Sequence, residues 1–192
     1  TINKAPLGIT VSGTYSGSTT LLAPTFTTTG LVTVSGVTET ITSLTNATLN
    51  SKDVANNSTN YVTAITIGGG TATASNYQIS QAYNASAGNT QNTVTLSKAT
   101  LTVTGTTAPS KTYDGTTTTT ITGGTISGRL GTDTVTLTQA GAYSSPGAGS
   151  GISITMNDSI DATSAANYNL TQPTVTGTIN KAPLGITVSG TY

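Results

Sequence analysis

Apolar residues alternate with small or polar residues along much of the chain, as expected for strands whose successive side chains point to opposite faces. Near the start, Leu7, Ile9 and Val11 alternate with glycine, threonine and serine. No stretch shows the 3.6-residue period of an amphipathic helix, and only residues 53–60 and 161–166 favour short helical turns. The chain is therefore predicted to be mainly β, with further strands over residues 31–34, 61–67, 94–103, 116–121, 133–137, 152–156 and 175–188.

The first fifteen residues, TINKAPLGITVSGTY, recur letter for letter at residues 178–192, an offset of 177 residues. Self-similarity over such a distance indicates a tandem array. We therefore expect one full repeat followed by the beginning of the next. The shared segment is predicted to close one module and open another, so that residues 178–188 pair on both sides and residues 189–192 are the least ordered.

A weaker repeat lies inside this unit and divides it into modules. The expected modules are residues 1–97 and residues 98–180, and residues 181–192 supply the first strand of the next repeat. Between the first two pairs of matching motifs the offset grows from 94 to 98 residues, which implies a four-residue insertion in the loop that holds Ala108 and Pro109. The matching segments are 3–7 with 97–101, 15–19 with 113–117, and 75–79 with 166–170.

The junctions between modules contain no Gly/Ser linker. Residues 93–104 and 174–188 cross the two boundaries with strand-like alternation. We therefore predict two small antiparallel β modules, joined by a continuous linking strand into an elongated rod. The pattern suits a β-grasp-like module and an immunoglobulin-like sandwich equally, and it leaves the strand order open.

Composition narrows the range of functions. Charged residues make up 6% of the chain, against roughly 25% in typical globular proteins, and the acids and bases cancel. This excludes the basic surface of a nucleic-acid or anionic-membrane binder, and no apolar run is long enough to insert in a membrane. Cysteine is absent, so disulfides do not stabilise the fold. Threonine-rich sequence favours strands because the branched β-carbon stiffens the side chain.

Catalytic chemistry finds little support in the sequence. Without histidine or cysteine, neither a Ser-His-Asp nor a Cys-His arrangement can form. Asp158 and Asp161 are the most closely spaced acids, and we interpret them as turn residues. No cluster of the D-x-D-x-D-G type is present to bind calcium. We expect no enzymatic activity, no cofactor and no metal site.

Two tyrosine motifs stand out, and both are interpreted as structural. Tyr113-Asp114-Gly115 predicts a turn anchored by a packed tyrosine, because Asp and Gly tolerate positive φ. Tyr15 and Gly17 mark the corresponding turn of the first module. Tyr77 and Tyr168 each follow a short polar turn, and we expect them to pack at a corner with the hydroxyl bonded to the backbone. Tyr61 and Tyr83 are the candidate ligand-contacting aromatics.

These motifs resemble the YDG-type and related MBG-type repeats of large bacterial surface adhesins, including filamentous-haemagglutinin-like proteins. The first module departs from the pattern, with Ser16 where the family has aspartate. The resemblance implies small β-rich modules in tandem on an exported protein, and it implies no particular ligand. It rests on residues 98–103, 111–117, 131–135, 167–170 and 177–182.

The repeat and the resemblance together predict a function in cell adhesion. We expect a secreted spacer or stalk repeat of an adhesin, monomeric at the bacterial surface, which projects an adhesive region and contributes to biofilms. Its partners would be the adjacent repeats of the same chain, with no nucleic acid and no membrane insertion. The alternative is an adhesin module that binds a glycan or a host protein through its loops and surface tyrosines.

Overall fold

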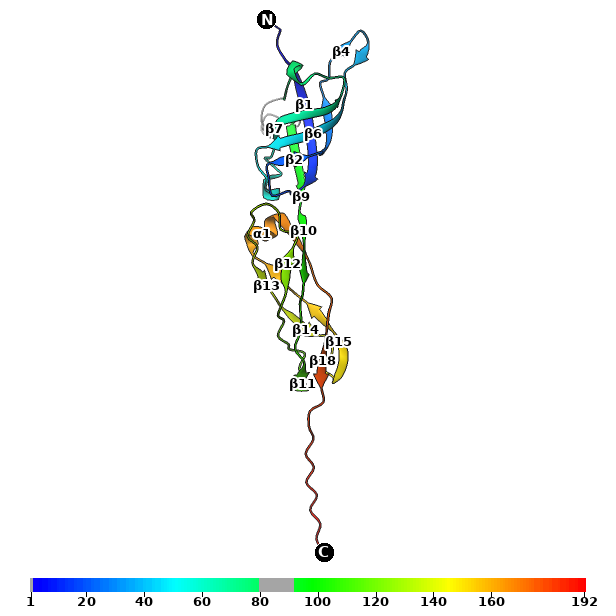
Figure 1. The fold of residues 1–192 in the computed structure, drawn as a ribbon, viewed down its shortest axis with the longest axis vertical. Coiled ribbons are helices and arrows are strands. Elements are labelled where there is room, and N and C mark those ends of the chain that lie inside the picture. The colour runs from blue at the N-terminus through cyan, green and yellow to red at the C-terminus, as the bar shows by residue number, and fades with distance from the viewer. Residues whose placement is uncertain (1, 80–91) are drawn as a thin grey trace. The chain divides into compact units, whose positions relative to one another are not determined.

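The computed structural model describes residues 2–79 and 92–192, and these are mainly β (Figure 1). The first part contains β1 (Ala5–Thr14), β2 (Thr20–Leu22), β3 (Thr25–Thr29), β4 (Thr33–Val34), β5 (Val37–Thr38), β6 (Ile41–Leu49), η1 (Val54–Asn56), β7 (Val62–Gly70), η2 (Ala74–Asn76), β8 (Tyr77–Ile79) and β9 (Asn92–Ser97). The second contains β10 (Ala99–Thr104), β11 (Lys111–Thr112), β12 (Thr125–Ser127), β13 (Leu137–Thr138), β14 (Gly141–Tyr143), β15 (Gly149–Met156), β16 (Ser159–Ile160), α1 (Ala162–Asn167), β17 (Tyr168–Thr171) and β18 (Val175–Asn180).

The chain divides into two compact units. Unit 1 comprises Thr1–Thr100, Arg129–Thr134 and Ala162–Asn169. Unit 2 comprises Leu101–Gly128, Val135–Asp161 and Leu170–Tyr192. Unit 1 therefore takes two short segments from the second half of the repeat. The boundaries inferred from the sequence, after residues 97 and 180, stay predictions.

Strand β1 is the centre of the first sheet of unit 1. It pairs antiparallel with β3 on one edge. Its other edge pairs parallel with β8 and then with β9, so β1 and β9 run side by side in Figure 1. Leu7, Ile9 and Val11, the apolar positions of the predicted alternation, are at most 1% exposed.

The core of unit 1 lies between two sheets. The second sheet has the order β2-β6-β7, and both pairings within it are antiparallel. Its apolar side chains join those of the first sheet in one buried cluster, so the unit is a sandwich of sheets. The cluster contains Ile9, Val11, Leu21, Leu44, Ala47, Leu49, Val62, Val94 and Leu96.

Unit 2 has a smaller core, formed by Ile121, Tyr143, Ile154, Val175 and Ile179. Its largest sheet has the order β11-β18-β15-β14, accompanied by the sheets β12-β10-β17 and β13-β16. The expectation of small antiparallel β sheets is confirmed for most of the described pairings. The pairs β1–β8, β1–β9 and β11–β18 are instead parallel.

The internal repeat appears in the backbone hydrogen bonds. The amide of Tyr15 donates to the carbonyl of Ser97, and the amide of Tyr113 donates to the carbonyl of Asn180, each at 2.8 Å. In the same way, Leu49 donates to Thr19 and Tyr143 donates to Thr117, again at 2.8 Å. The motifs matched along the sequence therefore occupy equivalent positions in the two modules. Residues 105–110, where the insertion was expected, separate β10 from β11.

Several predicted strands are shorter than expected. The strand over 94–103 is two strands, β9 and β10, with Lys98 between them, and the strand over 133–137 reaches regular pairing only at Leu137. Residues 116–121 form only an isolated bridge at Thr118, and Lys111 Nζ binds the carbonyls of Thr116 and Thr118. The short helical turns expected over 53–60 and 161–166 are confirmed as η1 and α1.

The predicted pairing of residues 178–188 is wrong beyond Asn180. Strand β18 ends there, after pairing with β11 and β15. Residues 181–192 have neither strand nor helix, and all are exposed. A strand requires a neighbouring backbone, and the described part of the chain provides none for this segment. Residues 181–188 therefore alternate apolar and polar side chains as a strand would, but no described strand pairs with them.

Candidate functional site

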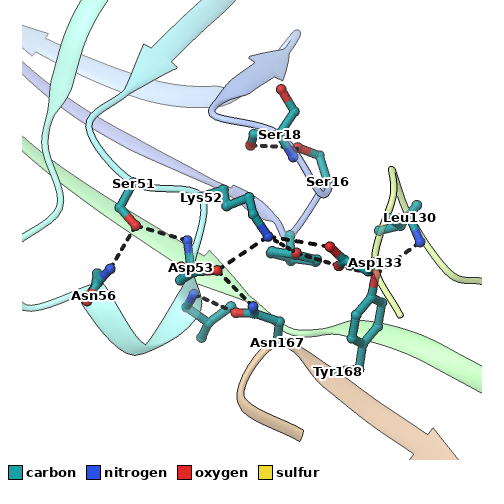
Figure 2. Close-up of polar contacts among 12 residues, drawn as sticks. Ser16, Ser18, Ser51, Lys52, Asp53, Asn56, Leu130, Asp133, Asn167 and Tyr168 are labelled. Carbon is teal, nitrogen blue, oxygen red and sulfur yellow. Dashed lines mark hydrogen bonds and ion pairs between the residues drawn. The ribbon is translucent and has the colours of Figure 1, made fainter. Parts of the chain in front are cut away.

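A cluster of four polar side chains lies in unit 1, and we call Tyr15, Lys52, Asp133 and Tyr168 the carboxylate cluster. Asp133 Oδ2 accepts hydrogen bonds from the hydroxyls of Tyr15 at 2.6 Å and of Tyr168 at 2.9 Å. Lys52 Nζ donates to the Tyr15 hydroxyl at 2.6 Å and lies 3.5 Å from Asp133 Oδ1. Figure 2 shows Lys52 and Tyr168 converging on Asp133.

Aromatic packing holds the same cluster together. The rings of Tyr15 and Tyr168 meet edge to face, with centroids 5.2 Å apart and planes at 76°. This is a favoured geometry for two aromatic rings, because the positive edge of one meets the negative face of the other. Lys52 Nζ lies 5.0 Å from the centre of the Tyr15 ring, within the range of a cation–π contact. Both tyrosines are buried.

Chain turns bring the four side chains together. Tyr15 directly follows β1, and Tyr168 begins β17 after α1. Gly17 has a φ of +74°, and a Cβ there would lie 3.0 Å from the carbonyl carbon of Leu130, so glycine is required for this close approach. The amide of Leu130 in turn donates to the Tyr168 hydroxyl at 3.0 Å.

Asn167 connects α1 to the loop that carries Lys52. Its Oδ1 accepts a hydrogen bond from the amide of Val54, and its Nδ2 donates to Asp53 Oδ1, both at 2.9 Å. Asp53 also lies 3.6 Å from Lys52 Nζ. The oxygen and the nitrogen of the Asn167 side-chain amide are therefore both used to fix the two segments against each other, as Figure 2 shows.

The protonation states of the cluster follow from its contacts. Burial raises the pKa of Tyr15 and Tyr168, and their hydrogen bonds to Asp133 add to this. Burial also opposes ionisation of Asp133, but the two hydroxyl donors and the charge of Lys52 outweigh it and lower the Asp133 pKa. The hydrogen bond to Tyr15 raises the pKa of Lys52. At neutral pH the cluster holds an ammonium, a carboxylate and two neutral phenols.

The contacts of the carboxylate cluster indicate a structural role rather than a catalytic one. Lys52 keeps its proton because its pKa is raised, so it is a poor nucleophile. The Asp133 oxygens already accept from protein donors. A cavity of about 260 Å³ adjoins the cluster. A larger one of about 610 Å³, lined by residues between Ser12 and Thr25, has no charged side chain among its described lining residues.

A second tyrosine corner repeats part of this geometry. The Tyr77 hydroxyl accepts a hydrogen bond from the amide of Val32 at 3.0 Å and donates to Glu39 Oε2. Tyr168 makes the equivalent bonds, from the Leu130 amide and to Asp133. The corner tyrosines expected from the sequence thus have their hydroxyls bonded to the backbone, and each also holds a carboxylate.

The sequence interpretation missed these two carboxylates, although a signal was present. Glycine with positive φ precedes each backbone donor by two residues, Gly30 before Val32 and Gly128 before Leu130. A threonine–acid pair follows in each module, Thr38-Glu39 and Thr132-Asp133. In the first module the hairpin of β4 and β5 lies between Gly30 and Glu39. It lengthens the spacing between glycine and acid relative to that between Gly128 and Asp133, so the two motifs do not align in the sequence.

The turn at residues 113–115 is held by a lysine rather than by its tyrosine. Tyr113 is 46% exposed, contrary to the packed tyrosine expected there. Lys111 Nζ pairs with Asp114 Oδ1 at 2.8 Å and donates to the carbonyl of Thr116 at 2.9 Å. Asp114 Oδ1 also accepts from the amide and the hydroxyl of Thr116 at 2.9 Å. Gly115 has a φ of +78°, as a turn glycine should.

Asp114 is expected to titrate near pH 2, because Lys111 and the Thr116 donors lower its pKa to about 2. Replacing Lys111 with methionine should raise this pKa toward the ordinary value of about 4. NMR titration of the Asp114 carboxyl carbon measures the change, and Lys181→Met is the matched control. An unchanged Asp114 midpoint in K111M would contradict this assignment of the ion pair.

The two candidate ligand-contacting tyrosines do not form a described site. Tyr61 is half-buried, and its amide donates to Asn50 Oδ1 at 2.7 Å. Tyr83 lies outside the described residues. Within residues 2–79 and 92–192, no group of three or more acidic, histidine or cysteine side chains could hold a metal ion. No helix in this part of the chain is long and apolar enough to cross a membrane.

Residues 97–176 match the family model of the YDG domain. This confirms the YDG-type resemblance that the motifs indicated for this segment. The matched segment contains Lys111 and Asp114 of the turn as well as Asp133 and Tyr168 of the carboxylate cluster. No curated protein and no solved structure matches the chain.

Proposed function

We propose that this chain is a structural spacer repeat of an adhesin at the bacterial cell surface, which projects an adhesive region away from the cell. The observation that carries the proposal is the 177-residue repeat, built from two modules with the same tyrosine–carboxylate corner. Repetition of one architecture produces length, whereas a binding or catalytic site needs only one copy. Secretion to the surface and a part in biofilms belong to the same proposal.

Stiffness is the property that a spacer needs, and two features support it. Only Lys98 separates β9 from β10, so no flexible linker divides the modules. Unit 1 also incorporates residues 129–134 and 162–169 from the second half of the repeat. The carboxylate cluster and Asn167 bind these segments to the loops around Tyr15 and Lys52. We propose that this interlocking restricts hinge motion along the repeat.

Small-angle scattering from the chain in solution tests the proposed stiffness. We expect an elongated particle whose pair-distance distribution is skewed and has an extended tail. A compact globule, or a profile that requires two modules tumbling independently, would contradict the proposal. Asp133→Ala, which removes the acceptor at the centre of the carboxylate cluster, should broaden the distribution, whereas Asp114→Ala, in a turn of unit 2, should leave it unchanged.

The alternative function is binding of a glycan or host protein, and the exposure of Tyr113 favours it. A tyrosine on an exposed turn can stack on a sugar face, as can Tyr61. A glycan array, followed by titration of any hit, separates the two functions. Millimolar or tighter binding that is lost in Tyr113→Ala or Tyr61→Ala would support the module as a binder. Absence of binding in the unmodified chain would contradict the binding function and favour the spacer function.

A further inference from the structure

Two identical sequences in this chain have opposite environments. In β1, Leu7, Ile9 and Val11 are at most 1% exposed. Their counterparts in the second copy of the sequence, Leu184, Ile186 and Val188, are 84%, 77% and 86% exposed. The two segments share the fifteen residues TINKAPLGITVSGTY and differ in whether neighbouring strands pair with them. Residues 182–191 therefore have the same side chains as β1, in the same order, but are not paired with a sheet.

The position occupied by β1 is specific for this sequence. Ile9 to Thr14 pair in register with Asn92 to Ser97 of β9. On the other edge, Gly8 to Ser12 pair with Thr29 to Thr25 of β3. A replacement strand must bond on both edges and bury three apolar side chains at alternate positions, since a slip of one residue would turn them outward. Residues 181–192 meet each of these requirements.

We propose that residues 181–192 of one copy of this chain bind a second copy by taking the place of its β1. The exchanged strand would run between β3 and β9 of the acceptor in the register of β1. Its last residue, Tyr192, corresponds to Tyr15. Tyr192 would therefore donate its hydroxyl to Asp133 of the acceptor and complete the carboxylate cluster there.

The same exchange gives a role to the exposed Tyr113. Tyr15 is bonded through its amide to Ser97, the residue before Lys98, and Tyr113 is bonded in the same way to Asn180, the residue before Lys181. Tyr15 meets Asp133 and Tyr168, whose counterparts in the first module are Glu39 and Tyr77. When residues 181–192 of a donor occupy the acceptor, Tyr113 of the donor would therefore lie against Glu39 and Tyr77 of the acceptor.

Competition decides when the exchange occurs. In the unmodified chain β1 is covalently attached to its own sheet, and its high effective concentration favours the internal strand. Disabling β1 removes the competitor and leaves residues 181–192 intact. The variant Ile9→Asn with Val11→Asn does this, because two polar side chains would have to enter the apolar core.

Sedimentation of this double variant tests the proposal. We expect oligomers that grow with protein concentration, each copy donating residues 181–192 to the next. An excess of the free peptide TINKAPLGITVSGTY should fill the acceptor positions and disperse the oligomers into folded monomers. Adding Ile186→Asn and Val188→Asn should abolish assembly. Tyr113→Ala, in the same double variant, should weaken assembly at least several-fold, whereas Tyr61→Ala should not.

Cysteine crosslinking provides a second readout of register, since the chain has no cysteine of its own. Thr10 pairs with Thr93, and their hydroxyls are 3.3 Å apart. In the double variant, Thr187→Cys should therefore form a disulfide with Thr93→Cys of another copy, whereas Thr191→Cys should not. Monomers at every concentration, aggregates that persist without the apolar residues of 181–192, or equal crosslinking from both positions would overturn the proposal.

Discussion

Replacing Ile9 with alanine is expected to lower the free energy of unfolding of unit 1 by about 3 kcal/mol, because a buried isoleucine leaves a cavity when truncated. The same replacement at Ile186 should leave stability unchanged. Ile186 has identical sequence neighbours but is exposed. Amide hydrogen exchange in β9, the strand beside β1, reports on unit 1 separately from unit 2 in a chain that contains both.

The paired variants control for everything except burial. Both remove the same atoms from the same local sequence, so changes in strand propensity and in the unfolded chain are matched. The comparison is made at low protein concentration, where strand exchange between copies is disfavoured. Equal protection of the β9 amides in I9A and I186A would contradict the assignment of residues 5–14 as the internal strand.

Asp133→Asn is expected to destabilise unit 1 by about 2 kcal/mol, which is the order of a hydrogen bond to a charged group. Asp133 accepts from two tyrosine hydroxyls and faces Lys52. Asparagine keeps the shape but loses the charge, and its amide nitrogen cannot accept from a hydroxyl. Chemical denaturation followed by hydrogen exchange in unit 1 measures the loss. Asp53→Asn, at a more exposed carboxylate of the same unit, should have a smaller effect.

Acid should reproduce the effect of Asp133→Asn. The folded pKa of Asp133 is below its ordinary value of about 4, so the folded state binds its proton less readily than the unfolded chain. The resulting stabilisation is present above about pH 4 and is lost as the pH falls through that value toward the lowered pKa. Asp133→Asn should flatten this part of the stability profile of unit 1. An unchanged acid dependence in the variant would place the responsible carboxylate elsewhere.

Local pattern was sufficient for strands β1 and β7 of unit 1, whereas β2, β3 and β6 were not predicted. Alternation at Leu7, Ile9 and Val11 predicted a strand with one buried face, and β1 has this form. The corner positions of Tyr77 and Tyr168 were also predictable, because each follows a short polar turn that the sequence marks with Ala, Ser and Asn. These features depend on neighbours within a few residues, which is the range at which sequence patterns carry information.

Contacts between distant residues could not be derived in the same way. Tyr15 and Asp133 are 118 residues apart, and no local period connects them. The parallel pairing of β1 with β9 also depends on a long chain excursion rather than on a hairpin. Residues 181–188 show the converse case, in which the pattern predicted a strand that the structure lacks. Their alternation matches that of β1, but no described strand pairs with them. Sequence pattern reports the capacity to form a strand, and pairing decides whether it forms.

The proposed spacer function is tested most directly by the dependence of molecular size on repeat number. Chains with one, two and four copies of the 177-residue repeat would be compared by small-angle scattering at low concentration. A stiff spacer predicts a radius of gyration that grows nearly in proportion to the number of copies. Growth with roughly the 0.6 power of length, as for a flexible chain, or roughly the 0.4 power, as for a compact particle, would contradict the account.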